Sequence, residues 1–461
     1  MQQFRKFLAG ISLVFLGLFA GEVLPAQDTV LNNYIRIGLE NNITLRRKYD
    51  SLDISLAALK ASRGLFYPDI SFNARYSVAE GGRMIDFPVG DLLNPVYQTL
   101  NQLTQSQQFP TVSNMQFPFL RPTEQETKLR LVQPLVNTDI IYNAKIRQSY
   151  TGVVRADAGT YRRELVAQIK TAYYTYLKTL RLEEVLKSTA GILRENIRVN
   201  QSLYDNEKVT LDVVLRSEAE LSDLQQRQAE AEKSRHTAAA WFNFLLNRDL
   251  SATIVVEEPR TVVVPVAIDQ ASEDALARRE ELVKIDGYTA MAGNNLRLRK
   301  STRIPDLTAV IDYGFQGEDY SFTANDDYVM ASLVLKWDIF KGLQNKRKIS
   351  EAKIQYQLLE DQRQEAENMI RLEVINAWYA LLASKKKIDA ARAREDAAVR
   401  GFRLVDRKYK QGQSNLLEYM DARNNMTRAE TGLVMARYDY FISYAGFERA
   451  AGLYSFSNET K

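Results

Sequence analysis

The chain of 461 residues contains an internal duplication, and this repeat limits its fold more than any other feature. The segment Tyr67-Pro68-Asp69-Ile70 returns 237 positions later as Ile304-Pro305-Asp306-Leu307. Further along, Ala172-Tyr173-Tyr174 returns as Ala377-Trp378-Tyr379, now 205 positions later. The shift falls by 32, so the first copy holds an insertion between these two matches. A duplication of this length predicts one elongated unit of two similar halves rather than several independent domains.

The composition excludes several classes of function. Lys and Arg together number 61 and Asp and Glu 57, a balance that does not indicate a nucleic-acid partner. Cysteine is absent and His236 is the one histidine, which removes disulfides, thiol chemistry, Cys/His metal sites and most catalytic triads. We therefore expect no enzyme activity, no catalytic residues, no metal site and no cofactor.

The first residues are typical of a secretory signal peptide. Arg5 and Lys6 precede an apolar run over about 7–20, and cleavage after Ala26 is expected. The run is shorter than the roughly 20 apolar residues that a helix needs to span a bilayer. We therefore interpret residues 1–26 as a signal peptide that sends the chain out of the cytoplasm, with an uncleaved membrane anchor as the alternative.

Four segments alternate between apolar and polar side chains, a pattern typical of strands. In the segment 70–78 every even-numbered residue is apolar and every odd-numbered residue is polar, and the segments 128–135, 307–315 and 331–339 show the same alternation. Lengths of about 9–11 residues are those of a tilted membrane strand with one face toward lipid. A soluble sheet with one buried face gives the same alternation.

Aromatic residues lie near the ends of these segments, where the interface of a bilayer would be. The expected membrane-interface aromatics are Tyr67, Tyr76, Tyr313, Trp337 and Phe340. They favour the membrane interpretation, as do the arrangement of two hairpins in an otherwise helical chain and the signal peptide.

Four strands cannot close a barrel, and open strand edges are not tolerated in hydrocarbon. Several copies of the chain must then share one barrel, and three copies would give twelve strands around an aqueous lumen. Geometry alone allows two or four copies as well. The sequence thus predicts a homo-oligomer in contact with membrane lipid, mainly α-helical but with a membrane β-barrel part.

Each second strand leads into a very long helical stretch, 139–206 in the first copy and 341–411 in the second, without proline. At about 1.5 Å per residue, each stretch makes a rod of roughly 100 Å. Apolar residues recur along both in steps of four and three, which is the spacing of a coiled-coil seam. The seam of the second stretch is Ile370, Val374, Ala377, Leu381, Ser384, Ile388, Ala391, Glu395, Ala398, Phe402, Val405 and Tyr409.

A short polar break ends each long stretch, and a return helix is expected after it at about 211–246 and 416–452. Thr210 and Ser414 are suitable N-cap residues for these return helices. Each copy would thus contribute one helical hairpin.

Shorter helices at about 29–65 and 272–303 are expected to precede the first strand of each copy. Between the copies, two β-prone runs at 253–256 and 261–264 are expected to form a small belt around the helices. The expected domains are a first repeat at 27–247, a linker and equatorial belt at 248–271, and a second repeat at 272–461.

Several motifs resemble those of the TolC-like outer membrane efflux proteins, and they cover essentially the whole chain after the signal peptide. The motifs are the paired Pro-Asp strand starts, Gln133-Pro134-Leu135 with Trp337-Asp338-Ile339-Phe340, Tyr409-x-x-Gly412-x-Ser414 with Leu416-Leu417-Glu418-Tyr419-Met420-Asp421-Ala422, and the terminal stretch Ala436–Gly452. The resemblance implies a homotrimer with a twelve-stranded barrel in the outer membrane of a Gram-negative bacterium and a long coiled-coil α-barrel in the periplasm.

The resemblance also implies a function. Such a channel is the exit duct of a tripartite efflux or type I secretion system, and it passes small molecules or secreted cargo passively from the periplasm to the exterior. The implied partners are a periplasmic adaptor protein and an inner-membrane pump. The alternative is a periplasmic adaptor or coiled-coil scaffold without a pore, because adaptors also carry long helical hairpins, although they lack two pairs of membrane-type strands.

Acidic residues are expected at a periplasmic gate that also sets selectivity. Glu418 and Asp421 lie three positions apart at the start of a return helix, hence on one face, and rotational symmetry would turn them into rings that favour cations. By resemblance they match the family's acidic constriction, and Tyr409 matches an aromatic of its closing network. Asp212 has a similar place in the first copy and could face them. An ordinary solvated helix face is the alternative.

By resemblance, the turns at the ends of the long helices are the adaptor-docking tips. They comprise Glu207, Lys208, Val209 and Thr210 in the first copy and Gly412, Gln413 and Ser414 in the second. The family usually has glycine where this chain has Glu207, so docking is expected more at Gly412 than at Glu207.

The insertion between the first two strands, about 80–126, is unusually apolar for an external loop and holds five prolines. We expect a loop that packs over or into the mouth of the barrel. A surface receptor or partner site is the alternative.

Overall fold

The computed structural model describes residues 29–260 and 266–456; the expected signal peptide and the β-prone run 261–264 lie outside the described residues. Within those residues the chain forms nine helices and six strands. Contacts divide it into two compact units, and each unit combines segments from both copies of the repeat. Unit 1 holds the residues up to Arg46, 161–278 and those from Ile370 onward; unit 2 holds 47–160 and 279–369.

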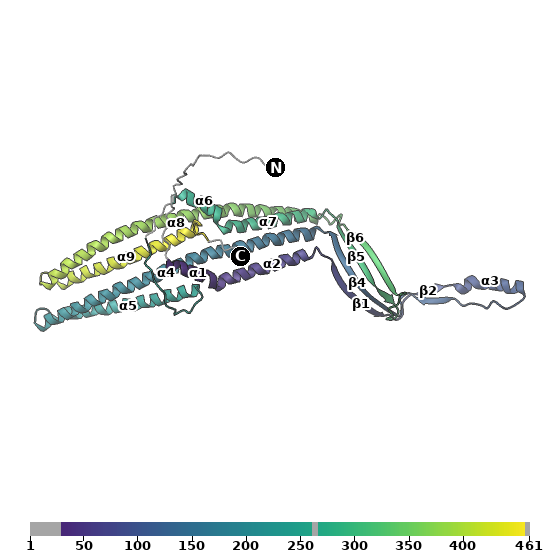
Figure 1. Ribbon diagram of the computed structural model, residues 1–461, viewed down its shortest axis with the longest axis horizontal. Helices are drawn as coiled ribbons and strands as arrows, with labels where there is room; N and C mark the ends of the chain where they lie inside the picture. Colours follow the sequence, from purple (N-terminus) through teal and green to yellow (C-terminus); the bar gives the residue numbers. More distant parts are fainter. Residues whose placement is uncertain (1–28, 261–265, 457–461) are drawn as a thin grey trace, which may run out of the picture. The chain divides into compact units, whose positions relative to one another are not determined.

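The four expected strands form one antiparallel sheet in unit 2, in the order β1-β4-β5-β6 (Figure 1). Their bounds are β1 (Asp69–Val78), β4 (Thr123–Val136), β5 (Asp306–Gly317) and β6 (Asp327–Lys336). The two predicted hairpins are the pairs β1–β4 and β5–β6, and β4–β5 pairing joins the two copies. Because β6 ends at Lys336, the prediction that the fourth strand runs to 339 was wrong, and Trp337 lies beyond it.

Strand register separates apolar from polar side chains, as the alternation predicted. Ile70, Leu131, Ile311 and Ala331 are aligned across the sheet on one face, and the next row, on the opposite face, is Ser71, Arg130, Asp312 and Met330. The apolar face is open to solvent in the single chain, with Phe72 68% and Leu333 72% exposed. Since β1 and β6 are the outermost strands of this sheet, each has one edge without a strand partner in the described chain.

The helices that precede the first strand of each copy are broken at equivalent residues. In place of the single helix predicted at 29–65 there are α1 (Thr29–Asn41) and α2 (Ile43–Gly64). In place of the one at 272–303 there are α6 (Ile268–Arg278) and α7 (Glu280–Ser301). The break residues, Asn42 and Arg279, are 237 positions apart, which is the shift of the strands.

The side chain of Asn42 accounts for the first break, because it hydrogen-bonds the backbone of α5 (Leu211–Leu245) and the first turn of α2. It is 6% exposed, its Nδ2 donates to the carbonyl of Leu245 at 2.9 Å, and its Oδ1 accepts from the N–H of Leu45 at 3.0 Å. It thus acts as the cap of α2. No sequence pattern indicated this break, since asparagine also occurs within helices.

The predicted long helices and return helices are present. They are α4 (Thr138–Asp205) with α5 (Leu211–Leu245), and α8 (Gln344–Lys410) with α9 (Leu416–Ala450). α4 has 68 residues and α8 has 67, and both are continuous. The coiled-coil seam is confirmed where it lies in unit 1, because its members Ile370, Val374 and Leu381 are buried.

The linker between the copies is tied to the helices of unit 1 by hydrogen bonds rather than by strand pairing. The N–H of Val255 donates to the Tyr34 hydroxyl and the N–H of Glu257 to the Tyr173 hydroxyl, both at 2.8 Å. The β-prone run 253–256 is extended but pairs with no strand in the described chain, and the belt stays a prediction. Tyrosine hydroxyls accept hydrogen bonds from the backbone N–H groups that would otherwise bond to a second strand.

The insertion in the first copy contains regular structure, and the prediction of a loop was wrong. It forms β2 (Met84–Phe87), α3 (Val89–Thr104) and β3 (Met115–Pro118), with β2 and β3 paired to each other. β4 already begins at Thr123, so the insertion is shorter than expected. The five prolines of this segment, among them Pro95 inside α3, argued against a helix and concealed α3 in the sequence.

Candidate functional site

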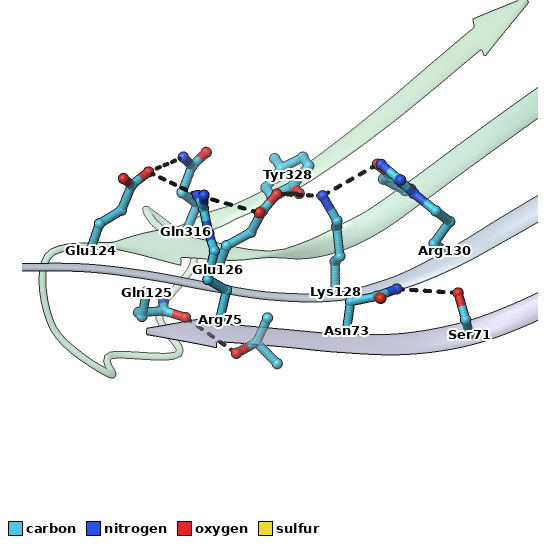
Figure 2. A network of polar contacts seen from close by, with 12 residues as sticks. Ser71, Asn73, Arg75, Glu124, Gln125, Glu126, Lys128, Arg130, Gln316 and Tyr328 are labelled. Carbon is cyan, nitrogen blue, oxygen red and sulfur yellow. Dashed lines mark hydrogen bonds and ion pairs between the residues drawn. The ribbon is translucent and has the colours of Figure 1, made fainter. Parts of the chain in front are cut away.

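The polar face of the sheet carries a connected group of charged side chains, which we call the polar-face network. Its members are Arg75, Glu124, Glu126, Lys128, Arg130 and Asp312. Figure 2 shows the four members from β4 side by side along that strand, with Arg75 from β1 next to them. Alternation along a strand places all of them on one face, opposite the apolar row.

Asp312 is the centre of the deepest part of this network. Arg130 donates to it through both Nε and Nη2, at 2.8 and 2.7 Å, in the two-point geometry that guanidinium and carboxylate groups favour. Lys128 lies 3.7 Å from the same carboxylate, and the Asp312 side chain is fully buried. A carboxylate without solvent contact is stable only because two cations compensate its charge.

Gly314 makes room for Lys128 in this cluster. A Cβ atom at position 314 would lie 2.5 Å from the Cβ of Lys128 and 2.4 Å from the carbonyl oxygen of Thr127. No side chain fits there without moving the neighbouring strand. The glycine therefore permits Lys128 to extend across β5 and to bind Glu126 at 2.5 Å as well as to approach Asp312.

The other end of the polar-face network is looser. Arg75 lies 3.7 Å from both Glu124 and Glu126. Gln316 donates to Glu124 at 2.9 Å, and the Tyr328 hydroxyl donates to Glu126 at 3.0 Å. The network has three cations and three anions, so it lines this face with dense charge of both signs and little net charge.

Sequence reasoning treated these residues only as the wet face of the strands and did not propose them as a site. The signal that could have found them is the run of charged residues at every second position of β4, namely Glu124, Glu126, Lys128 and Arg130. Register then aligns Arg130 with Asp312, which no pattern along the chain reveals.

The two turns that end the long helices have the same backbone geometry. Glu207 and Gly412 both adopt the left-handed conformation, with φ of 57° and 71°. In each turn the next N–H donates back to the helix at 2.8 Å, from Lys208 to Leu203 and from Gln413 to Lys408. These are Schellman ends, in which a glycine is the usual left-handed residue. Replacement of glycine by glutamate has therefore not changed the form of the first tip.

The N-caps of the return helices are only partly as predicted. Thr210 is the N-cap residue of α5 but makes no side-chain capping bond, because its hydroxyl donates to Asp212 instead. For α9 the prediction of Ser414 was wrong, since Asn415 is the N-cap and accepts from the N–H of Glu418 at 2.9 Å. The Ser414 hydroxyl donates to the Glu418 carboxylate at 2.5 Å.

The three predicted gate acids are exposed, and each has a local partner. Asp212 lies 3.8 Å from Arg216, Glu418 binds Ser414, and Asp421 accepts from Asn425 at 3.2 Å. Among the residues that the structure describes, no hydrogen bond or ion pair joins Asp212 to Glu418 or Asp421. Within one chain these acids are therefore not brought together, and their convergence requires several copies.

Tyr409, the fourth predicted gate residue, connects the two helical hairpins of unit 1. Its hydroxyl donates to Oδ1 of Asn200 on α4 at 2.7 Å, and Nδ2 of Asn200 donates to Ser217 on α5 at 2.8 Å. The Tyr409 ring packs on Tyr419 with centroids 4.8 Å apart. Burial raises the pKa of Tyr409 and raises that of Tyr419 to about 12. Both side chains line a groove of about 360 Å³ between α4, α8 and the start of α9.

A second link between the hairpins was missed by sequence reasoning. Arg423 on α9 is 2% exposed and donates to Glu220 on α5 at 2.6 Å. Arg423 lies among buried Tyr419 and Met426 at helical spacing, so a charge inside an apolar stripe was the signal that could have found it. A buried charge needs an ionic partner, so Glu220 stabilises Arg423 in this position.

Farther along the same helices, a groove of about 690 Å³ between α4, α8 and α9 is lined by charges of both signs, including Arg181, Glu395 and Glu430. Burial, and then the nearby Glu395, raise the pKa of the Glu430 carboxyl.

In the described parts of the chain no group of three or more His, Cys, Asp or Glu residues could hold a metal ion. No helix among the described residues has the length and apolar character needed to cross a membrane.

Comparison with known proteins gives a sequence family and a fold. Residues 271–453 match the family described as "Outer membrane efflux protein", and no curated protein matches the chain. Three solved structures each align with 92% of the chain. They are the Campylobacter jejuni CmeC outer membrane channel (16% identity, 86% of that chain, TM-score 0.77), the Neisseria gonorrhoeae MtrE outer membrane channel (17%, 89%, 0.75) and the Vibrio cholerae outer membrane protein VceC (13%, 96%, 0.74). At these identities the likeness shows the fold, which is TolC-like as predicted.

Proposed function

We propose that this chain, which carries an outer membrane efflux protein domain over residues 271–453 and has the TolC-like fold, is an outer membrane exit duct of a Gram-negative bacterium. It conducts small molecules or secreted cargo passively from the periplasm to the exterior, as part of a tripartite efflux or type I secretion system. The duct is a channel and not an enzyme.

The observation that carries this proposal is the open four-stranded sheet with one apolar and one charged face. In hydrocarbon every backbone N–H and C=O needs a partner, so the free edges of β1 and β6 must pair with further strands. Pairing β6 of one copy with β1 of the next closes a barrel, and three copies supply twelve strands. The apolar face then meets lipid and the polar-face network lines the lumen.

Aromatic side chains fit such a membrane position. Tyr67, Tyr76, Tyr313, Trp337 and Phe340 are all exposed in the single chain. In the trimer they contact outer membrane lipid. The rings of Tyr and Trp, which carry a polar group, are favoured at the interface, and the apolar Phe340 ring is removed from water there. Trp337 and Phe340 lie just past the end of β6, at the side where the strands meet the helices.

In the same proposal the helical hairpins surround a periplasmic conduit. The turns 207–210 and 412–414 dock with a periplasmic adaptor, which connects the duct to an inner-membrane pump. Equal Schellman geometry at Glu207 and Gly412 supports docking at both turns rather than at Gly412 alone. At the same end, threefold symmetry gathers Asp212, Glu418 and Asp421 into acidic rings that favour cations, and Tyr409 holds the adjoining helices together.

A periplasmic adaptor or scaffold without a pore is the alternative. Adaptors have no need of four membrane-type strands, and the exposed apolar face of the sheet would be unfavourable in water. Membrane fractionation separates the two, because a scaffold would be recovered in the soluble periplasm.

Conductance in planar bilayers tests the duct and its gate. The wild-type protein should form cation-preferring channels, and Glu418→Ala with Asp421→Ala should reduce the cation preference because the acidic rings are removed. Asp205→Ala, which removes an exposed acid at the same end of α4, is the matched control and should leave selectivity unchanged. Unaltered selectivity in the double variant would reject the gate assignment, and absence of any conductance from the wild type would reject the duct.

A further inference from the structure

The insertion between β1 and β4 forms a separate arm, residues 79–122. β2 and β3 pair at its base, α3 follows β2, and the residues 105–114 return alongside α3 (Figure 1). A hydrogen bond from the N–H of Ala79 to the carbonyl of Pro122 closes the arm where it leaves the sheet. The proposed function gives this arm no role.

Two asparagines hold the returning segment against α3. Asn94 exchanges two bonds with the backbone of Val112, at 2.8 and 2.9 Å, and Asn101 exchanges two with Phe109, at 2.8 and 3.1 Å. The ring of Tyr97 packs on Phe109 with centroids 5.7 Å apart. The inner face of α3 is therefore hydrogen-bonded and packed against the returning segment of the arm.

The outer face of α3 is apolar but uncovered. Leu92, Val96, Thr99 and Leu103 follow one another at steps of four, three and four, the spacing of a coiled-coil seam. Leu92 is 68%, Val96 52% and Leu103 76% exposed, so the seam has no partner in the described chain. A helix with apolar residues on two faces is typical of one that packs on both.

The charge of the arm indicates what covers the seam. Only five of the 44 arm residues are charged, against 26% of the whole chain, and α3 contains a single charged residue, Asp91. A helix that binds an anionic lipid surface is rich in Lys and Arg on its polar face, and α3 has neither. The spacing of the seam is instead the one that packs against another helix with the same spacing, as in a coiled coil.

The place of the arm next to an edge strand indicates that the partner of the seam is a second copy of the chain. The arm begins directly after Val78, the last residue of β1, and β1 is an edge strand. In a closed barrel β1 pairs with the next copy, so the arms of neighbouring copies emerge at the same rim. We propose that the outer seams of α3 from three copies pack together as a short three-helix bundle that stabilises the trimer outside the membrane; this inference depends on the proposed function.

Cysteine cross-linking tests this bundle, and the natural chain contains no cysteine that would interfere. In a parallel bundle around a threefold axis, the same seam residue of each copy lies near the axis. Leu103→Cys in the full-length protein, treated with a short bis-maleimide, should convert most of the monomer band on a denaturing gel into cross-linked dimer. Leu103 is highly exposed, so the substitution should not disturb the fold of the monomer.

Gln98→Cys is the matched control, because Gln98 is exposed on the same helix but lies outside the seam. It should give little cross-linked product. Cross-linking of both variants to the same extent would indicate random collision and would overturn the bundle. A bimane label on Leu103→Cys that is quenched by brominated lipid would overturn it too, by placing the seam against the bilayer.

The mass of the detergent-solubilised variants separates failure of this inference from failure of the proposed function. Trimers in which Leu103→Cys does not cross-link would reject the bundle and leave the shared barrel intact. Monomers would reject the shared barrel and the bundle together.

Discussion

Residues at the helix tips show that one backbone geometry is reached with two different side chains. Glu207 adopts the same left-handed conformation as Gly412, and both turns make the same pair of return hydrogen bonds. A left-handed residue with a Cβ costs about 1–2 kcal/mol more than a right-handed one, whereas glycine has no such cost. The first tip is thus the more strained of the two.

Replacing Glu207 with glycine should therefore stabilise the helical hairpin. The gain is at most about 1 kcal/mol, because glycine also has more conformational freedom in the unfolded chain. The melting temperature of the helical circular dichroism signal in detergent should rise. Gly412→Ala, the matched change at the other tip, should lower it. A lower melting temperature for Glu207→Gly would contradict the strain at this turn.

At the same scale, the sequence predicted single residues unevenly. Tyr409 was predicted at the gate; its hydroxyl donates to Asn200 of the other hairpin, and its role in the gate stays a prediction. Ser414 was predicted to cap α9, yet Asn415 does so, because both residue types suit an N-cap and only the backbone decides between them. Arg423 was missed since its partner, Glu220, is 203 residues away in the chain.

Elements with strong periodicity were predicted best. The alternation of 70–78 and the coiled-coil seam gave β1, α4 and α8 nearly to their ends. α3 was not predicted, because Pro95 lies inside it and its neighbours are short and turn-rich. The break at Asn42 was missed because it depends on buried side-chain contacts rather than on local propensity, and the break at Arg279 lies at the equivalent position of the second copy.

The sheet should depend on Asp312 far more than on the outer part of the polar-face network. Asp312→Ala leaves Arg130 and Lys128 without the carboxylate that they share. Because the Arg130 side chain is 39% exposed, the expected loss is about 1–3 kcal/mol, less than for a pair buried on both sides. The temperature at which the β signal of the trimer is lost, measured by infrared spectroscopy, should fall clearly.

Glu124→Ala is the control for that change. Glu124 lies 3.7 Å from Arg75, whose side chain is 58% exposed, and ion pairs this exposed contribute about 1 kcal/mol or less. The melting temperature of the Glu124→Ala variant should stay near that of the wild type. Equal losses for the two variants would show that the buried position of Asp312 has no special importance.

At the scale of the whole molecule, the duplication explains why one chain carries two hairpins of each kind. The shift of 237 positions relates β1 to β5 and Asn42 to Arg279, so the two copies share even their helix breaks. The number of copies in the assembly could not be derived from the chain, because edge strands demand a partner without fixing how many copies close the ring. Resemblance supplied the number three.

The central claim is that three copies complete one barrel by pairing β1 of one chain with β6 of the next. Native mass spectrometry of the purified protein, released from detergent micelles, measures this most directly. The account predicts a single species with three times the mass of the mature chain. A monomer as the dominant species, with the β signal of the sheet intact, would contradict it.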